Sequence, residues 1–592
     1  MTDVMQRDEV RDTQNPRSPG RPADASFPRG RRAAPPRSDV GTIILHWATA
    51  IAFVVSLLTG IRMATFGHVL PNLSQWLWPI TPQGEMWTWH FFSGLGLFFC
   101  ASAYLVYLNR AGLTARNALA KVRVALMPVG GMLRWQAINV GLHWFVYALI
   151  TVMTVTGIIL YLGYGGWWVW VHSISAFIGF GYIFLHVLTH YLADGWWQLF
   201  RLFRPARLVI TRAVRPYPLL IAMAVGVATI ALAAGVDWTT RDTLLITRVS
   251  GAPPQLDGVL DDEVWAKTRP VYVRTQQGAN LGGTGESLVE VRAVQDGERV
   301  YFAFKWEDPS RSLRRVPVIK KDDGWHFLAT RADLADVSDF YEDKLAIGFS
   351  RSPTFGAGES SYLGSKPLAD KPAPIHGMGY HYTAPGNLMD VWQWKASRGG
   401  HLGFVDDQYF EAPREPTPAE AAGQARYQAG YWNDPGRVFY SYNYAGVPPG
   451  SPSGPLKLPR LPKDWKATVA ALGTFDLDPD SSDTEGARWW MMTETETVPY
   501  SAELDAAIPV GTVLPAVLIA GNYEGDRADL RGAAKWKDGH WHLETMRTLK
   551  TGNKFDHDLV PGRDLYMWVN VFDHTQIRHS RHARPIRIVT QP

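Results

Sequence analysis

Cysteine is almost absent from this chain: a single residue, Cys100, stands inside an apolar run. One thiol cannot form an intramolecular disulfide, ligate an iron–sulfur cluster or build a zinc ribbon. The Cys-x-x-Cys-His motif that attaches haem covalently is excluded as well. Any haem bound by this protein is therefore held without a covalent bond to the chain.

A large excess of charge is also absent. The formal net charge is +4 over 592 residues, and the basic residues concentrate in a few segments. Nucleic-acid-binding proteins carry a continuous basic surface, so this distribution favours a membrane topology and predicts no nucleic-acid partner. The sequence also lacks a recognisable Ser–His–Asp arrangement, a phosphate-binding loop and a cysteine ligand for a molybdopterin metal. These absences indicate that the chain is not a complete substrate-transforming enzyme of those classes.

Long apolar runs are abundant. Each is long enough to span a bilayer, and they lie at roughly 41–62, 87–108, 137–161, 168–192 and 217–236. Residues 1–40 before them are rich in Arg, Pro, Asp and Ser, which predicts a disordered tail. Arg31-Arg32 resembles a twin-arginine signal, but Ala-Ala-Pro-Pro follows it and no cleavage site succeeds the first apolar run.

Basic residues predict the orientation of these runs. Lys and Arg stand before the first run, between the second and third and between the fourth and fifth, whereas 63–86 and 162–167 contain none. By the positive-inside rule, the N-terminus is cytoplasmic and everything after residue 236 lies outside. Tryptophans at the outer ends of the runs fit an interfacial belt: Trp76, Trp78, Trp87, Trp89, Trp167, Trp168 and Trp170.

Histidines inside the runs are the main candidate functional residues. His172 and His186 share a face of the fourth run to within about 40° and lie roughly 21 Å apart along a helix. Early positions in the first and second runs place His46 at the depth of His186 and His90 at the depth of His172. Ionisable groups in a membrane are costly, and imidazole suits haem iron. We therefore predict two b-type haems, one between His46 and His186 and one between His90 and His172.

Two further histidines leave alternatives open. His143 matches His46 in an internal repeat, because Leu-His-Trp precedes a Thr-Gly pair in both the first and third runs, with the Gly fourteen residues after the His. His190 lies one turn beyond His186, so it could replace His186 as a ligand or line a proton or quinone path. A transmembrane histidine can also simply hydrogen-bond to a neighbouring helix.

The residue pattern of the sequence changes near residue 240. Short alternating runs such as VYVRT, LVEVRAV and YMWVNVF are separated by Gly, Pro, Asp and Asn, which is typical of an antiparallel β-sandwich. The Pro- and Gly-rich stretch 350–465 predicts long loops with few strands. The predicted fold class is thus a membrane all-α helical bundle, a four-helix dihaem core (41–200) with a fifth anchor helix (201–240), followed by an all-β periplasmic sandwich (241–592).

The membrane half resembles bacterial cytochrome b561, nickel–iron hydrogenase b-type subunits and formate dehydrogenase cytochrome subunits. The resemblance covers about 40–200 and rests on one histidine in the first helix, one in the second and a pair fourteen apart in the fourth. It implies a protein of the bacterial inner membrane that exchanges electrons with quinone or quinol near one haem. A periplasmic redox protein or oxidoreductase subunit is the implied partner in a respiratory chain.

The second half resembles the haem-binding domain of ethylbenzene dehydrogenase γ-subunits and related c-552/DMSO-reductase-type domains. The stretches that carry the resemblance include LDGVLDDEVW (256–265), VYFAFKWEDPS (300–310), MDVWQWKA (389–396) and FDHTQIRHSRHARP (572–585). The resemblance implies a β-sandwich with one b-type haem, whose axial ligands come from two distant segments.

The ligands of this third haem are predicted from two histidine-rich segments. The family pattern pairs Met with Lys; here Met378 fits the first position, whereas histidines replace an obvious lysine at the second. We therefore expect one of His376 or Met378 to act with one of His579 or His582. Packing on the porphyrin or pairing with its propionates is expected of Trp392, Trp394 and Arg578.

A different resemblance leads to the alternative function. LDGVLDDEVW followed by an aromatic strand also looks like the opening of family 9 carbohydrate-binding modules, whose aromatic residues stack on sugar. The sandwich would then be a ligand-sensing module on a redox anchor. Haem stoichiometry separates the two hypotheses, since electron transfer through the sandwich requires three haems per chain and a binding module requires two.

Overall fold

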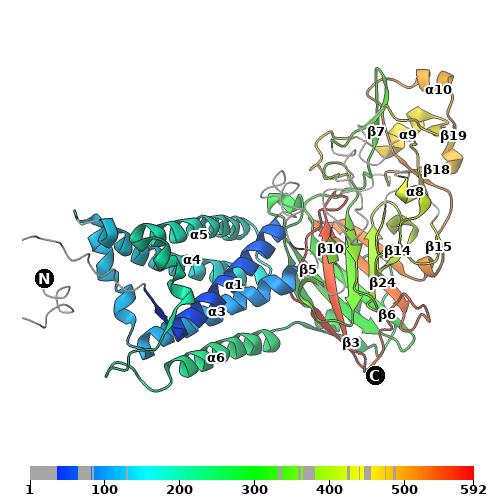
Figure 1. Cartoon of the computed structure of the whole chain (residues 1–592). Coiled ribbons are helices and arrows are strands. Elements are labelled where there is room, and N and C mark those ends of the chain that lie inside the picture. Colours follow the sequence, from blue (N-terminus) through cyan, green and yellow to red (C-terminus); the bar gives the residue numbers. More distant parts are fainter. Residues whose placement is uncertain are drawn as a thin grey trace, which may run out of the picture.

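The computed structural model describes residues 36–64, 82, 86–128, 131–330, 337–357, 362–364, 380–422, 427–438, 440–445, 455–473, 475–483 and 489–592. Five long apolar helices form its N-terminal part: α1 (Val40–Ala64), α3 (Met86–Arg110), α4 (Gly131–Tyr161), α5 (Trp167–Phe200) and α6 (Pro218–Thr239). Each is long and apolar enough to cross a membrane. Helix α1 packs along α3, α4 along α5, and α6 against α3 (Figure 1). The predicted five-helix membrane bundle is confirmed.

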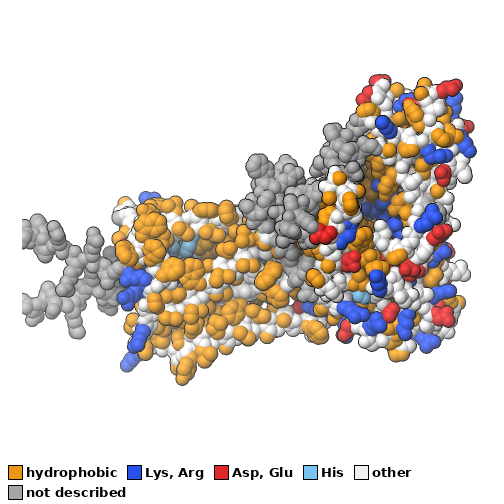
Figure 2. All heavy atoms as spheres, turned by 45° about the vertical axis from the view of Figure 1, so that its right-hand side comes forward, with side chains coloured by type: hydrophobic (Ala, Val, Ile, Leu, Met, Phe, Trp, Pro, Cys, Tyr) orange, Lys and Arg blue, Asp and Glu red, His pale blue; other side chains and the backbone are white. Residues whose placement is uncertain are grey.

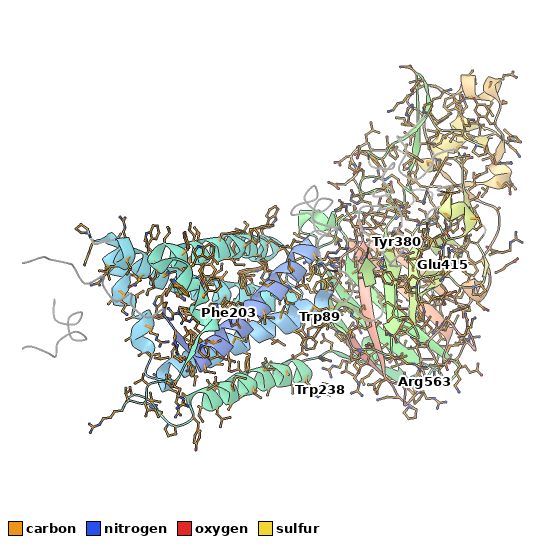
Figure 3. All side chains as sticks on the ribbon, viewed as in Figure 1. Trp89, Phe203, Trp238, Tyr380, Glu415 and Arg563 are labelled. Atoms are coloured by element: carbon orange, nitrogen blue, oxygen red, sulfur yellow. The ribbon has the colours of Figure 1, made fainter. Side chains whose placement is uncertain are left out.

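The outer surface of the bundle suits lipid. Figure 2 shows hydrophobic side chains covering its length, with Lys and Arg gathered at the end away from the β-domain. At the opposite end, Trp89 and Trp238 are largely exposed beside the β-domain (Figure 3). Apolar flanks with aromatic residues at one end and basic residues at the other are typical of a membrane-spanning bundle.

The basic end of the bundle is closed by short elements. Strand β1 (Ser38–Asp39) pairs with β2 (Pro205–Ala206), and η2 (Thr114–Asn117) and η3 (Leu119–Leu126) join α3 to α4. The buried Asp39 carboxylate accepts hydrogen bonds from Tyr107 and Arg116. The chain segments before α1 and after α3 are thereby held together.

A mostly β domain follows α6. Its large sheet has the order β14 (Tyr431–Asn433), β13 (Asp406–Phe410), β12 (Met389–Lys395), β9 (Lys344–Ser350), β25 (Leu565–Phe572), β26 (Ile586–Thr590), β3 (Thr243–Arg248), β5 (Ser287–Gln295), β6 (Arg299–Glu307), β24 (His540–Thr548) and β23 (Arg531–Lys537). Strand β4 (Val271–Thr275) also pairs with β5. The two halves of this sheet face each other across one core, where Phe302 of β6 contacts Phe349 of β9 and Trp392 of β12. This arrangement is the expected sandwich, with β3 joining its layers.

The smaller elements lie around this core. Two small sheets are formed by β20 (Val513–Leu514), β7 (Val318–Lys321) and β8 (Gly324–Phe327), and by β16 (Tyr440–Tyr442), β21 (Val517–Ile519) and β18 (Met492–Thr493). Strand pairs are β10 (Tyr362–Gly364) with β11 (Tyr380–Tyr382), β15 (Gly436–Arg437) with β22 (Glu524–Gly525), and β17 (Arg460–Pro462) with β19 (Thr497–Pro499). Short helices include α7 (Glu263–Lys267), α8 (Pro418–Ala421), α9 (Trp465–Leu472) and α10 (Ala502–Ala507).

The structure differs from a purely antiparallel sandwich at β3. This strand pairs in parallel with both β26 and β5. Strand β3 begins shortly after α6 ends, so its direction is set by the chain leaving the membrane end of the domain. Local alternation in a sequence reports a strand but not the direction of its partner.

The expectation of few strands in 350–465 is wrong in part, because β12 and β13 lie within the large sheet. Trp392 and Trp394 of β12 are fully buried between the layers. Trp394 contacts Trp306 and Trp541 of the opposite layer. These tryptophans therefore form the hydrophobic core instead of the porphyrin contacts predicted for them.

Candidate functional site

A first pair of histidines lies at the end of the bundle next to the β-domain. The rings of His90 in α3 and His172 in α5 have centroids 6.1 Å apart. A metal–imidazole bond of about 2 Å puts each centroid about 3 Å from the metal, so two imidazoles on one iron lie roughly 6 Å apart. The separation of this outer pair therefore matches two ligands of one haem iron.

The Thr-Gly pairs of the sequence repeat surround the outer pair. Nδ1 of His90 lies 3.1 Å from the Thr59 hydroxyl and 3.1 Å from the Ser56 carbonyl, and Nδ1 of His172 lies 2.8 Å from the Thr156 hydroxyl. These contacts engage Nδ1 and leave Nε2 of each ring for a metal. A fixed tautomer and ring orientation are what an axial ligand requires.

The glycine of each pair keeps space beside the same ring. A Cβ added at Gly60 would lie 3.0 Å from Cε1 of His90, and one added at Gly157 would lie 3.5 Å from Cε1 of His172. Both glycines line a cavity of about 1760 Å³ that also contains the two histidines. Since a typical small-molecule pocket has roughly 300–1,000 Å³, this cavity accommodates a group as large as haem.

A second pair lies deeper in the bundle, toward its basic end. The ring centroids of His46 in α1 and His186 in α5 are 6.3 Å apart and their planes are nearly parallel, at 26°. The Tyr182 hydroxyl lies 3.2 Å from Nδ1 of His186. The predicted depth pairs are thus brought together at both levels of the membrane, with separations that fit one iron each.

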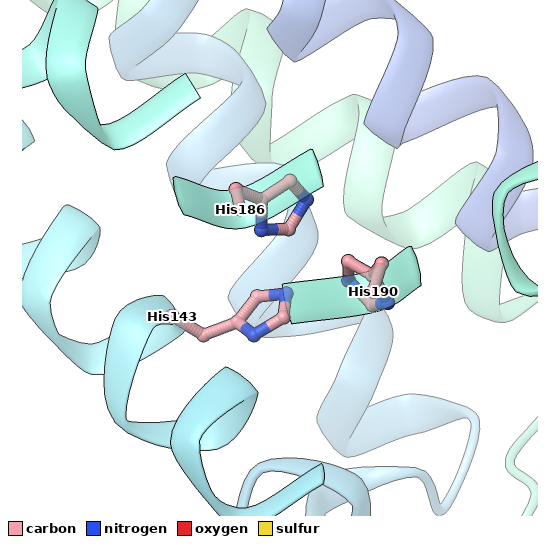
Figure 4. A group of neighbouring side chains, drawn as sticks. All are labelled: His143, His186 and His190. Carbon is pink, nitrogen blue, oxygen red and sulfur yellow. The ribbon is translucent and has the colours of Figure 1, made fainter. Parts of the chain in front are cut away.

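Two more histidines stand beside the inner pair. His143 and His190 have ring centroids 5.3 and 4.6 Å from that of His186, and the three side chains form one group (Figure 4). Nδ1 of His143 contacts the Asn139 carbonyl at 2.6 Å. His143 and His190 are themselves 6.2 Å apart, so this pair is a second geometric candidate for a ligand pair.

A third pair lies in the β-domain. His381 of β11 and His579 have ring centroids 6.5 Å apart, close to the separations in the membrane. His381 stacks on Phe410 at 4.9 Å, and His579 packs against Phe572 at 4.8 Å. His579 contacts the Ser580 carbonyl through Nδ1, and burial lowers its pKa to about 3. Its ring is therefore neutral, the form in which imidazole binds metals.

His582 is engaged differently from His579. Its Nε2 accepts a hydrogen bond from the Val569 amide, and its Nδ1 donates to the Arg584 carbonyl. With both ring nitrogens engaged, His582 offers no lone pair to iron in this arrangement. His376 and Met378 lie outside the described residues.

His381 is the residue that the sequence reasoning passed over. It lies three residues after Met378, but Met378 matched the family pattern. In β11, Tyr380 and Tyr382 are buried in a tyrosine cluster, so the alternation of a strand puts His381 on the opposite face. That alternation is the signal that could have identified it.

Comparisons with known proteins agree with the two halves of the structure. A family model described as prokaryotic cytochrome b561 matches residues 37–204, and one described as ethylbenzene dehydrogenase matches residues 262–584. The chain belongs to the ethylbenzene dehydrogenase family and carries a prokaryotic cytochrome b561 membrane domain. Because members of the b561 family bind b-type haem, the membrane half is that of a membrane b-type cytochrome.

No curated protein matches the chain. Two solved structures of a family 9 carbohydrate-binding module from Caldicellulosiruptor kristjanssonii, in complex with cellotriose and with glucose, are 6% and 8% identical and both have a TM-score of 0.21. Both matches cover 59% of this chain, and 93% and 95% of the modules.

The b561 domain and the ethylbenzene dehydrogenase-family domain are in direct contact. Phe355 packs on Phe91 at 5.0 Å and on Tyr161 at 5.6 Å. Arg584 pairs with Asp237 at the end of α6 at 3.4 Å. The cavity around the outer histidines continues to residues of the β-domain, including Asn280, Arg578 and Arg584. The outer pair is therefore enclosed by both domains.

Proposed function

We propose that this b-type cytochrome transfers electrons between the quinone pool and a periplasmic redox partner through three noncovalently bound haems. His46 and His186 would hold the inner haem, His90 and His172 the outer haem, and His381 and His579 a haem in the periplasmic domain. The observation that carries the proposal is that three histidine pairs share separations of 6.1 to 6.5 Å.

The residues of the chain perform three tasks in this function. Histidines hold each iron and set its ligand type, while hydroxyls such as those of Thr59 and Thr156 fix the ring orientation. Apolar helices surround the two membrane sites. The haems supply one-electron redox chemistry when bound, and the protein sets their spacing and surroundings.

The orientation of the chain is part of the proposal. Basic side chains gather at the end of the bundle that bears β1 and β2, and the β-domain stands at the other end (Figure 2). With the positive-inside rule, the N-terminus is cytoplasmic and the domain that follows α6 is periplasmic. The inner haem then lies on the cytoplasmic side of the bacterial inner membrane.

His143 and His190 have a proposed role beside the inner haem. Quinol oxidation releases protons, and quinone reduction takes them up, so a quinone site needs groups that exchange protons. The two rings lie within 5.3 Å of His186 and are not required by the His46–His186 pair. We assign them to hydrogen bonding and proton exchange with the quinone head group.

Haem stoichiometry of the full-length protein tests the function. A pyridine haemochrome assay on detergent-purified protein should give three haems b per chain. Two haems per chain would support the sandwich as a binding module instead. A preparation without a Soret band would end the cytochrome proposal.

A further inference from the structure

A group of buried and half-buried carboxylates lies at one end of the large sheet and includes none of the paired histidines. It consists of Asp390 in β12, Asp407 in β13, Asp434 after β14, Asp529 after η10 (Asp526–Ala528) and Asp556 in the segment after β24. Oxygen atoms of Asp390, Asp407 and Asp556 lie within 4.8 Å of one another. Asp390 and Asp407 are fully buried. We refer to these five residues as the aspartate cluster.

Among the described residues, one arginine, Arg547, contacts the aspartate cluster. Arg547 of β24 is fully buried and lies 3.1 Å from Asp390, 3.8 Å from Asp407 and 3.5 Å from Asp556. Its Nη2 is directed to the His557 carbonyl. A single guanidinium cannot balance five carboxylates, so the cluster as described lacks positive charge.

Individual carboxylate oxygens in the cluster also lack hydrogen-bond donors within the described structure. These atoms are Oδ1 of Asp390, Oδ2 of Asp407, Oδ1 of Asp434, Oδ1 of Asp529 and both carboxylate oxygens of Asp556. Buried polar atoms are normally paired with a donor, a water or an ion. Oδ1 of Asp390, whose side chain is 0% exposed, has neither a hydrogen-bond donor nor an ion pair in the described structure, and such an oxygen beside other carboxylates points to a bound cation.

We propose that the aspartate cluster is a calcium site. Calcium takes six to eight oxygen ligands in flexible geometry, which suits carboxylates from five separate segments. Magnesium demands near-ideal octahedral geometry and retains several waters, which suits a closed cluster poorly. The nearby imidazole of His557 contacts the Leu388 carbonyl through Nε2, so the group offers oxygen rather than nitrogen or sulfur ligands.

The position of the cluster defines what calcium would do. Asp390 and Asp407 belong to one layer of the sandwich, whereas Asp556 follows β24 of the other layer. An ion shared among them would fasten the two layers at this end. The role is structural, because none of the paired histidines belongs to the cluster.

The test uses the full-length protein in detergent. Metal analysis of protein purified without chelator should find calcium bound to the chain. After EGTA treatment and dialysis, added CaCl₂ should raise the unfolding temperature of the β-domain, followed by near-ultraviolet circular dichroism, and MgCl₂ should not. Protein that lacks calcium and does not respond to CaCl₂, or that responds equally to MgCl₂, would overturn the assignment.

Single Asp→Asn substitutions test whether the aspartate cluster is responsible for the stabilisation by CaCl₂. Asp407→Asn should abolish stabilisation by CaCl₂, and Asp556→Asn, in the segment after β24, provides a second variant if the first does not fold. Asp558→Asn is the matched control, because Asp558 lies two residues from Asp556 but pairs with Arg563 at 3.1 Å and is partly exposed. A full calcium response in Asp556→Asn, or its loss in Asp558→Asn, would contradict the site. Carboxyl groups that share protons instead of a cation would show stability gained in acid and no calcium response, which also overturns the proposal.

Discussion

Arg578 and His579 are neighbours in the chain but serve different histidine pairs. Arg578 lines the cavity that holds His90 and His172, whereas the ring of His579 faces that of His381. Adjacent Cα atoms are about 3.8 Å apart, so the walls of the two sites meet in this dipeptide. Under the proposed function, this proximity gives electrons a short route from the membrane to the periplasmic haem.

Single substitutions should remove the membrane haems one at a time. His172→Ala should lose the outer haem and keep the inner one, and His186→Ala should do the reverse, because each removes one axial ligand. Low-temperature optical spectra and haem-to-protein ratios measure the outcome. If either variant kept both membrane haem signals, the pairing by depth would be wrong.

The inner pair can be separated from its neighbours by a comparison of two variants. His46→Ala should lose the inner haem, whereas His143→Ala should keep it and slow reduction by quinol, since His143 is assigned to proton exchange. Haem content and stopped-flow reduction by a soluble quinol analogue give the two readouts. Loss of haem in His143→Ala together with retention in His46→Ala would transfer the ligand role to the His143–His190 pair.

The periplasmic haem should depend on His381. His381→Ala should reduce the haem content from three to two per chain, and Met378→Ala should leave it at three. His542→Ala in β24 serves as the control for a histidine outside the site. The opposite pattern, with haem lost in Met378→Ala and retained in His381→Ala, would restore the Met ligand that the family pattern predicts.

Contact between the two domains should control electron transfer rather than haem binding. Arg584→Ala removes the ion pair with Asp237 and a hydrogen bond to the Thr240 hydroxyl at 3.0 Å. We expect slower oxidation of the membrane haems by a periplasmic acceptor, at unchanged haem content. Arg587→Ala is the matched control, since Arg587 lies three residues further on in β26 and pairs with the exposed Asp564. Equal rates in both variants would argue against a role for this contact.

The buried pair of Glu342 and Arg398 should contribute strongly to the stability of the β-domain. Glu342 accepts hydrogen bonds from the Ser397 amide and from the Arg398 amide and guanidinium. Glu342→Gln leaves the arginine buried without its counter-ion, and such a loss costs about 3–5 kcal/mol. The unfolding temperature should therefore fall clearly, whereas Glu263→Gln on the surface should leave it unchanged.

Acid should remove part of the stability that the Glu342–Arg398 pair provides in the wild-type protein. Burial alone would raise the pKa of Glu342, but Arg398, Arg315 and Lys344 together lower it below its ordinary value of 4.5. A depressed pKa in the folded state stabilises the fold above about pH 4.5, and this stabilisation is lost as the pH falls through the lowered pKa. Thermal unfolding from pH 7 to pH 3 should show a smaller acid-induced decrease in Glu342→Gln.

The sequence predicted those features that depend on local physics. A bilayer requires long apolar helices, so the five spans were recoverable, and the rise of a helix was sufficient to match His46 with His186 and His90 with His172 in depth. The sheet order was not recoverable, because the pairing of β3 with β26 joins the two ends of the domain. Alternation in β12 showed that Trp392 and Trp394 share a face but not that this face is the core.

The connection between the membrane and the β-domain is very short. Only residues 240–242 separate α6 from β3, and three extended residues reach about 10 Å. The β-domain therefore stays close to the membrane surface and cannot diffuse to a distant electron acceptor. Under the proposed function, a soluble redox partner must therefore diffuse to the membrane surface to exchange electrons with this domain.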